Sequence, residues 1–163
     1  MRVLAMAHDI SRDHGEEVVH VYGILQNAFI FMADLVRTVR CPVICHFMEM
    51  ESVETKEAGH QPWRKIGYGS IGDVAGQNIL LVDAVVDSGI TFDHLAQQLL
   101  LHNPKSLRTA VLISREDRRR VDCRLDYVGF QWTGGRLVGY GLDKDGSCRN
   151  LPYVAELPAE ASN

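Results

Sequence analysis

The sequence predicts an α/β fold with a mostly parallel central sheet flanked by helices. Short apolar runs typical of buried strands recur along the chain, and two segments with the apolar spacing of a helix lie between them. This alternation of strand and helix favours an α/β domain with a mostly parallel sheet. The chain has 163 residues, which is the length of one domain, so we expect residues 1–163 to form a single domain.

The first elements follow from these patterns. An apolar run within residues 16–25 predicts a buried strand, and the spacing from residue 28 to about 37–40 predicts a mostly buried helix with Asn27 as its N-cap. Residues 42–48 form a second strand by the same criterion. Residues 49–65 have no apolar period and contain four glutamates, which predicts a long polar loop or irregular hairpin. Loops of this length often act as lids, although a disordered insertion has the same composition.

The later elements are shorter. They are a central buried strand at 79–82, a helix at 91–101, a strand at 109–113, and two short strands at 125–130 and 137–140. The tail from residue 156 is expected to be unstructured.

Composition excludes several classes of protein. Hydrophobic residues make up 46% and charged residues 23%, as in ordinary globular proteins, and no apolar run is long enough for a membrane span. We find no signal-peptide pattern at the N-terminus and expect a cytoplasmic protein. A formal net charge of −4 argues against a general nucleic-acid binder. The four cysteines lack the spacing of a zinc site, so buried free thiols are expected.

One segment carries most of the chemistry. The central strand is expected to end at Asp83, and Asp87, Ser88, Gly89 and Thr91 lie in the turn that leads into the next helix. A helix N-terminus offers unpaired N–H groups to a phosphate, and Gly89 lets the backbone approach closely. Asp83 and Asp87 suit sugar hydroxyls, a divalent cation or proton abstraction. The alternative is an N-capping turn that binds no ligand.

This turn resembles the phosphoribosyl-pyrophosphate loop of the type I phosphoribosyltransferases, in particular the hypoxanthine-guanine branch. The segments that are similar to that branch are residues 23–37, 126–130, 138–143 and 149–153, in order. The resemblance runs from about residue 4 to residue 157 and is weakest between 49 and 73. It implies a small hood built from the chain ends, and self-association as a homodimer or homotetramer.

The resemblance also implies an activity. The family transfers a phosphoribosyl group from 5-phosphoribosyl 1-pyrophosphate to N9 of hypoxanthine or guanine, with magnesium as cofactor, giving a nucleoside monophosphate and pyrophosphate. Such a site must position the two substrates, neutralise the pyrophosphate and offer a base. The partners implied are small-molecule substrates, with no nucleic acid and no membrane.

Each matching position has an implied role. Asp87 corresponds to the general base near the purine N7, and Asp83 to the first of two acids that hold the ribose hydroxyls and magnesium. The implied contacts to the 5′-phosphate come from Ser88, Gly89, Ile90 and Thr91, and those to pyrophosphate come from Gln26, Asn27, the lid residue Ser52 and Arg149. The implied contacts to the purine come from Arg115, Arg136, Leu137 and Asp143, and Asp143 is also expected to bind a second magnesium.

The chain departs from the family pattern at several contacts. Ala84 replaces the second ribose acid, Gln26-Asn27 replaces Lys-Gly, Val53 replaces the tyrosine after the lid serine, and Arg136 replaces the aromatic residue that stacks on the purine. Loss of the acid predicts weaker donor binding. Two alternatives therefore stay open: a phosphoribosyltransferase with another acceptor, and a non-catalytic nucleotide- or donor-binding regulator. The basic run 118–120 is expected to be a solvated loop.

Overall fold

The computed structural model describes residues 1–55, 63–68 and 72–158, with side chains outside residues 50–71. The elements run in the order α1 (Arg2–His14), β1 (Val19–Leu25), α2 (Phe29–Val36), β2 (Val43–Thr55), β3 (Trp63–Tyr68), β4 (Asn78–Val86), α3 (Ile90–Leu100), β5 (Ser106–Ser114), the 3-10 helix η1 (Glu116–Arg118), β6 (Tyr127–Gln131), β7 (Leu137–Val138) and β8 (Ala155–Glu156).

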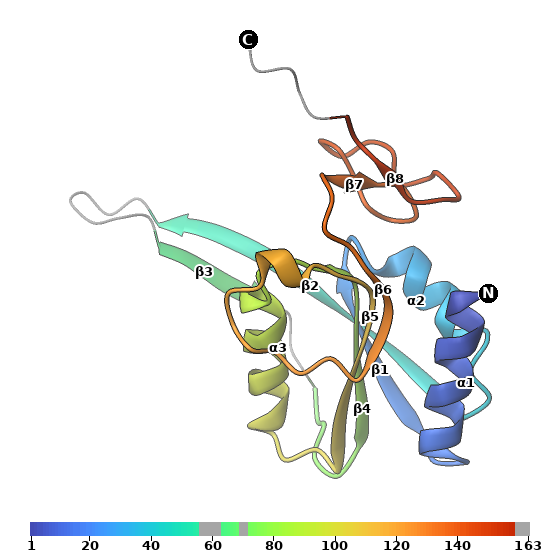
Figure 1. The fold of residues 1–163 in the computed structure, drawn as a ribbon. Helices are drawn as coiled ribbons and strands as arrows, with labels where there is room; N and C mark the ends of the chain where they lie inside the picture. Colours follow the sequence, from blue (N-terminus) through green and yellow to red (C-terminus); the bar gives the residue numbers. More distant parts are fainter. Residues whose placement is uncertain (56–62, 69–71, 159–163) are drawn as a thin grey trace.

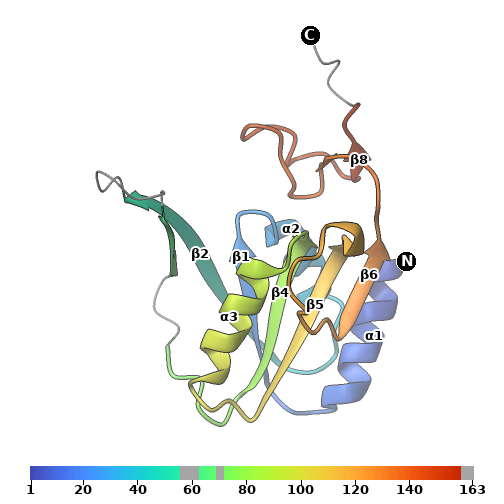
Figure 2. The same cartoon turned by 60° about the vertical axis from the view of Figure 1, so that its left-hand side comes forward.

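A six-stranded sheet in the order β3-β2-β1-β4-β5-β6 forms the centre of the molecule (Figure 1). The pairs from β2 to β6 are parallel, and β3 alone is antiparallel to its neighbour. Helices α1 and α2 lie on one side of the sheet and α3 lies on the other (Figures 1 and 2). The predicted fold class, a mostly parallel sheet flanked by helices, is confirmed.

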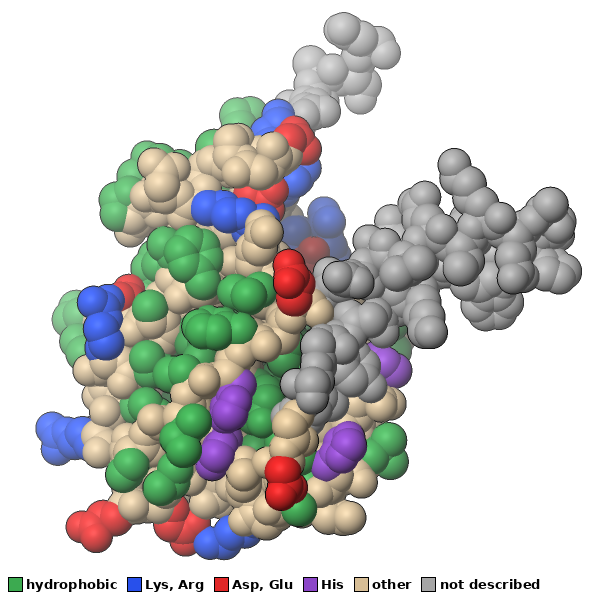
Figure 3. Space-filling model, turned by 180° about the vertical axis from the view of Figure 1, so that it is seen from behind, with side chains coloured by type: hydrophobic (Ala, Val, Ile, Leu, Met, Phe, Trp, Pro, Cys, Tyr) green, Lys and Arg blue, Asp and Glu red, His purple; other side chains and the backbone are tan. Residues whose placement is uncertain are grey.

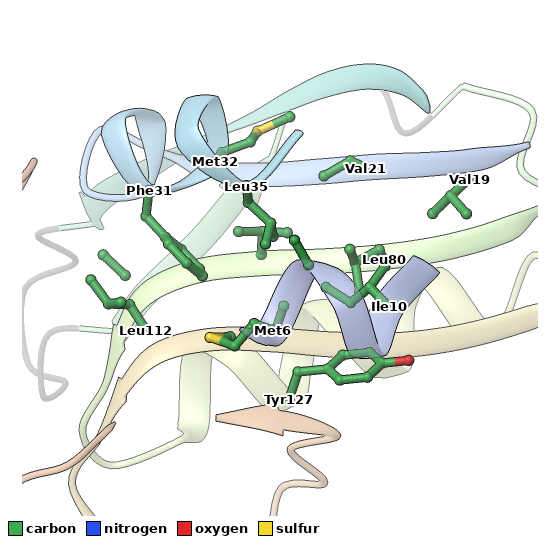
Figure 4. Packing of buried hydrophobic residues seen from close by; sticks show 14 of the residues in the cluster. Met6, Ile10, Val19, Val21, Phe31, Met32, Leu35, Leu80, Leu112 and Tyr127 are labelled. Carbon is green, nitrogen blue, oxygen red and sulfur yellow. The ribbon is translucent and has the colours of Figure 1, made fainter. Parts of the chain in front are cut away.

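Two apolar clusters cover the two faces of the sheet. On one face, side chains of α1 and α2 pack against β1, β4 and β5, and Figure 4 shows Met6, Ile10, Val19, Val21, Phe31, Met32, Leu35, Leu80, Leu112 and Tyr127 of this cluster. On the other face, Phe92, Leu95 and Leu99 of α3 pack against the alternate side chains of the strands. Because β4 is buried on both faces, its sequence is almost continuously apolar.

Helix α1 was not predicted from the sequence. Its buried residues Met6, Ile10 and His14 recur at four-residue spacing, which is a helical signal, but charged residues on the exposed face dilute it. The expected hood from both chain ends is therefore a hood from the C-terminal segment only, because the N-terminal end forms α1 against α2 and β6.

The segment after the second predicted strand is a hairpin, which is one of the two forms predicted for it. Strand β2 continues through the polar residues to Thr55 and pairs with β3, from Met50 opposite Tyr68 to Thr55 opposite Trp63. The middle of the predicted lid, residues 56–62, lies outside the described residues.

The C-terminal segment folds over one edge of the sheet as a hood (Figures 1 and 2). The chain enters the hood directly from the end of β6, so the hood lies at the carboxyl edge of the parallel strands. Tyr140 Oη donates a hydrogen bond of 2.5 Å to Asp34 Oδ2 on α2, which fastens the hood to the helical layer. Glu156, expected in an unstructured tail, pairs with Leu137 between β7 and β8.

No helix in the described part of the chain is long and apolar enough to cross a membrane.

Candidate active site

The turn after β4 lies at the carboxyl edge of the sheet. The sequence predicted that this strand ends at Asp83, but β4 continues to Val86. The pairing with β5 persists as far as Val86, which lies opposite Ser114. Helix α3 begins four residues later, with Gly89 as its N-cap. The turn thus joins a buried strand to a helix N-terminus, the arrangement that favours anion binding.

Gly89 is required at this turn for two reasons. Its φ is +80°, a left-handed conformation that side chains disfavour. A Cβ atom here would also lie 3.0 Å from Cys123 Sγ and 3.1 Å from Arg119 Cδ. The backbone amides of Arg120 and Val121 donate to the Ser88 carbonyl at 2.9 and 3.3 Å, so the segment after β5 holds the turn in place from behind.

A cavity of about 190 Å³ and a second of about 170 Å³ adjoin this turn. The smaller one, called the donor cavity below, is lined by Asp83, Val85, Val86, Asp87, Ser88, Gly89, Thr91 and Phe92. The structure thus brings both candidate acids together with three of the four candidate phosphate residues. The fourth, Ile90, does not line this cavity, and its side chain is 45% exposed.

Asp83 is half-buried beside this turn. Burial raises the pKa of its carboxyl group to about 7, although the amides of Ala84 and Val85 act in the opposite direction. The Ala84 amide donates to Asp83 Oδ1 at 2.7 Å. The neighbouring Ala84 side chain is fully buried in the apolar cluster beneath α2, so an acid at that position would enter the core rather than the donor cavity.

The larger cavity, called the base cavity below, lies between the sheet edge and the hood. It is lined by Asn27, Val85, Asp87, Arg115, Arg136, Leu137, Leu142 and Asp143. The four candidate purine residues therefore converge here from separate parts of the chain. Val85 and Asp87 line both cavities, so the two adjoin each other. Sequence reasoning missed the apolar wall of Val85 and Leu142, since single aliphatic residues carry no chemical signal.

Arg115 is the buried cation of the base cavity. Its side chain is 4% exposed, and its Nε lies 3.4 Å from Asp87 Oδ1. Its Nη2 donates to the Gly134 carbonyl, and its amide donates to the Val86 carbonyl at 3.0 Å. The sheet edge and the hood entrance thus fix the guanidinium from both sides.

The prediction that Asn27 caps α2 is wrong. The N-cap is Ala28, which makes no side-chain capping bond. Instead, Asn27 Oδ1 accepts a hydrogen bond of 2.6 Å from Arg149 Nη1, and Arg149 Nη2 lies 3.0 Å from Asp143 Oδ1. A contact with the hood therefore replaces the local cap.

For the other two candidate pyrophosphate residues, no contact with either cavity is described. Gln26 is exposed and lines neither cavity. Ser52 lies in β2, opposite Ile66, and its side chain is outside the described residues.

Arg119 corrects the prediction of a solvated basic loop. Its Nη2 donates to Ser114 Oγ at 2.7 Å and its Nη1 contacts Cys123 Sγ, so the side chain lies partly buried directly behind Gly89. Its neighbours Arg118 and Arg120 are exposed, as expected. No sequence signal distinguishes Arg119 from them.

Comparison with known proteins decides the family. A model described as "Phosphoribosyl transferase domain" matches residues 1–145. The chain belongs to this phosphoribosyltransferase family. A hypoxanthine-guanine phosphoribosyltransferase of Aquifex aeolicus is 40% identical over 94% of this chain and 86% of its own length. One of Dictyostelium discoideum is 34% identical over 98% of this chain and 90% of its own.

Solved phosphoribosyltransferases have the same fold. The crystal structure of a hypoxanthine-guanine phosphoribosyltransferase from Bacillus anthracis has a TM-score of 0.81 and 33% identity, over 95% of this chain and 89% of that one. A hypoxanthine phosphoribosyltransferase from Trypanosoma cruzi, complexed with the product IMP, has a TM-score of 0.85 and 27% identity, over 98% and 85% of the two chains. The resemblance to the family is therefore confirmed.

Proposed function

We propose that this phosphoribosyltransferase transfers a phosphoribosyl group from 5-phosphoribosyl 1-pyrophosphate to N9 of a 6-oxopurine, hypoxanthine or guanine, in purine salvage. The observation that carries the proposal is the pair of adjoining cavities that share Asp87. One cavity adjoins a helix N-terminus suited to a phosphate, and the other is lined by a buried arginine and by the hood. A reaction that joins a sugar phosphate to a base needs this arrangement.

The donor cavity takes the ribose phosphate. Helix N-terminal amides and the hydroxyls of Ser88 and Thr91 surround the 5′-phosphate, with Gly89 and Ile90 contributing backbone N–H groups. Asp83 receives the ribose hydroxyls, to which a carboxylate can accept hydrogen bonds.

The base cavity takes the purine. Arg115 donates to O6, and Arg136 bounds the ring from the hood, where a guanidinium can donate to an oxygen at the edge of a base. Leu137 gives an apolar contact, and the backbone and carboxylate of Asp143 lie at the remaining edge. Asp87 accepts the proton that leaves the base at N7.

In the proposed reaction, one bond to C1′ forms and another breaks where the two cavities meet. The N9–C1′ bond forms as the bond from C1′ to the pyrophosphate oxygen breaks, the base proton passes to Asp87, and pyrophosphate leaves with its electron pair. Arg149 and Asn27 receive the pyrophosphate, and Gln26 and Ser52 remain predicted contacts of the same group. Positioning the substrates and stabilising the anionic leaving group are the main contributions expected of the protein.

Magnesium fits this site as a partner of the substrate. Asp83 and Asp143 are carboxylates, the donors that Mg²⁺ prefers, and Mg²⁺ typically binds one or two carboxylates together with substrate phosphates. Within the described residues, no three His, Cys, Asp or Glu side chains are grouped so as to hold a metal ion by themselves. When bound, the ion would neutralise charge on the pyrophosphate.

We further propose that residues 1–163 act as one domain that self-associates as a homodimer or homotetramer. Phe29 on α2 is 40% exposed and Phe47 on β2 is 58% exposed, which leaves apolar surface for a second copy. Hydrophobic side chains are visible at the surface from behind the molecule (Figure 3). Cys41, Cys45, Cys123 and Cys148 are free thiols, and a cytoplasmic location would keep them reduced. The expectation that they are buried is correct for Cys41 but wrong for Cys45, which is exposed.

A direct assay tests the function. Purified protein, 5-phosphoribosyl 1-pyrophosphate and Mg²⁺ are mixed with each free base in turn, and pyrophosphate release is measured against a blank without base. Release with hypoxanthine or guanine supports the proposal. Saturable donor binding by calorimetry without release from any base would instead support a non-catalytic sensor.

A further inference from the structure

The polar groups that face the base cavity are mostly hydrogen-bond donors. Asn27 Oδ1 is occupied by Arg149 Nη1 at 2.6 Å, which leaves the amide nitrogen of Asn27 for a ligand. The buried Arg115 Nε has no hydrogen-bond partner among the described residues. Arg136 adds a second guanidinium from the hood. Three side chains on different walls of the cavity therefore offer N–H groups.

Each oxygen of Asp143 in the same cavity already has one partner within the protein. Asp143 Oδ1 lies 3.0 Å from Arg149 Nη2, and Asp143 Oδ2 accepts the Gly146 amide at 2.7 Å. The backbone carbonyl of Asp143 accepts Arg136 Nη2 at 3.3 Å. Among the side chains that line the cavity, Asp87, which is 52% exposed, keeps a free carboxylate oxygen. The proposed reaction uses that oxygen for the proton of the base.

The charges of the cavity point the same way. Arg115 is paired with Asp87 and Arg149 with Asp143, so Arg136 is the cation of the lining that has no carboxylate partner among the contacts described. A base with several carbonyl oxygens and an acidic ring N–H complements such a cavity. An exocyclic amino group at C2 would instead face the Arg136 guanidinium, another donor, and would compete with it for the Asp143 carbonyl, which Arg136 Nη2 contacts at 3.3 Å.

We propose that the preferred acceptor is a purine with carbonyl groups at both C2 and C6, that is xanthine, rather than the 2-aminopurine guanine. The inference rests on the proposed function and names the substrate class of the same site. With Asp87 at N7 and Arg115 at O6, the C2 edge of the ring faces the hood, where Arg136 supplies a donor. A hydrogen bond to a charged group corresponds to a discrimination of about 10- to 150-fold.

The test compares three bases with the unmodified protein. The ratio of kcat/KM for xanthine to that for guanine is expected to be at least about 10, the lower bound for one charge-assisted hydrogen bond. Equal values, or a preference for guanine, would overturn the inference while leaving the proposed function intact if hypoxanthine reacts. Dissociation constants of xanthosine and guanosine 5′-monophosphates, measured by calorimetry, give a readout independent of turnover. Tighter binding of the guanosine nucleotide would overturn the inference even in a protein that releases no pyrophosphate.

Two variants assign the preference to Arg136. Arg136→Phe removes the donor and should lower the xanthine-to-guanine ratio by about 10-fold or more. Arg136→Lys keeps a cationic donor and should retain the preference for xanthine. Turnover with hypoxanthine, which has no C2 substituent, reports whether each variant still folds and functions. A ratio that is the same in both variants as in the parent protein would contradict the role of Arg136.

Discussion

Arg149 in the hood donates a hydrogen bond of 2.6 Å to the side-chain oxygen of Asn27, in the connection between β1 and α2. The same guanidinium group lies 3.0 Å from Asp143 Oδ1 and donates to the Gly141 carbonyl at 2.6 Å. One side chain therefore connects the sheet edge, the hood and the rim of the base cavity. The guanidinium group is thus already positioned when a pyrophosphate arrives.

Replacing Arg149 with Met should weaken pyrophosphate binding by about 10- to 150-fold, since a hydrogen bond between charged groups is lost. Arg149→Lys should lie between the parent and Arg149→Met, because lysine keeps the charge but not the planar set of donors. Calorimetry with pyrophosphate and Mg²⁺ measures the effect. Arg12→Met on α1 is the matched control, an exposed arginine paired with Asp9 and Asp13. Equal losses in both Met variants would contradict a specific role for Arg149.

Ala84→Asp should destabilise the protein rather than restore a ribose contact. The Ala84 side chain is fully buried against apolar neighbours, so an ionised carboxylate there would be unpaired. We expect a loss of at least about 3 kcal/mol in the free energy of unfolding at pH 8, measured by urea denaturation. Ala84→Asn controls for size without a charge. At pH 4, where the buried acid is neutral, the two variants should have similar free energies of unfolding. An Ala84→Asp protein as stable as the parent and with tighter donor binding would refute this reading.

The sequence was most informative where one segment carried its own pattern. The buried strand and helix around Gly89 were predicted because a continuous apolar run and helical spacing are both local signals. Resemblance to a known family then indicated the residues of the base cavity, because Arg115, Arg136 and Asp143 share no local pattern in the sequence.

Features that depend on packing between distant segments were not predictable. Asn27 is an ordinary N-cap residue by its position, and only the hood, more than 100 residues later, turns its side chain toward Arg149. Arg119 is one of three consecutive arginines, and only the fold places it behind Gly89. The pairing of polar β2 with β3 likewise extends a strand beyond its apolar residues.

Asp83 should make stability depend on pH. Its folded-state pKa of about 7 lies above the ordinary value of 3.8 for an aspartate, so between about pH 4 and pH 7 the unfolded chain releases a proton that the folded protein retains. Stability therefore falls as pH rises through this window. Asp83→Asn, which can still accept the Ala84 amide, should gain stability relative to the parent at pH 8 but not at pH 3.5, by urea denaturation. A difference between the two proteins that does not change with pH would contradict the raised pKa.

Asp87→Asn separates a chemical role of Asp87 from a role in shaping the turn. The amide keeps the size of the side chain and its place near Arg115 Nε, which lies 3.4 Å from Asp87 Oδ1 in the parent protein, but it cannot take a proton from the base. General-base assistance contributes about 10²–10⁴-fold, so turnover with the preferred base should fall by that factor. Donor affinity should change little, because the phosphate contacts come from Ser88, Gly89 and Thr91. Pyrophosphate release gives the turnover and calorimetry gives the donor affinity. A fall in affinity that matches the fall in turnover would show that Asp87 organises the donor cavity instead of accepting the proton, and the base would then have to be sought elsewhere among the residues of the hood.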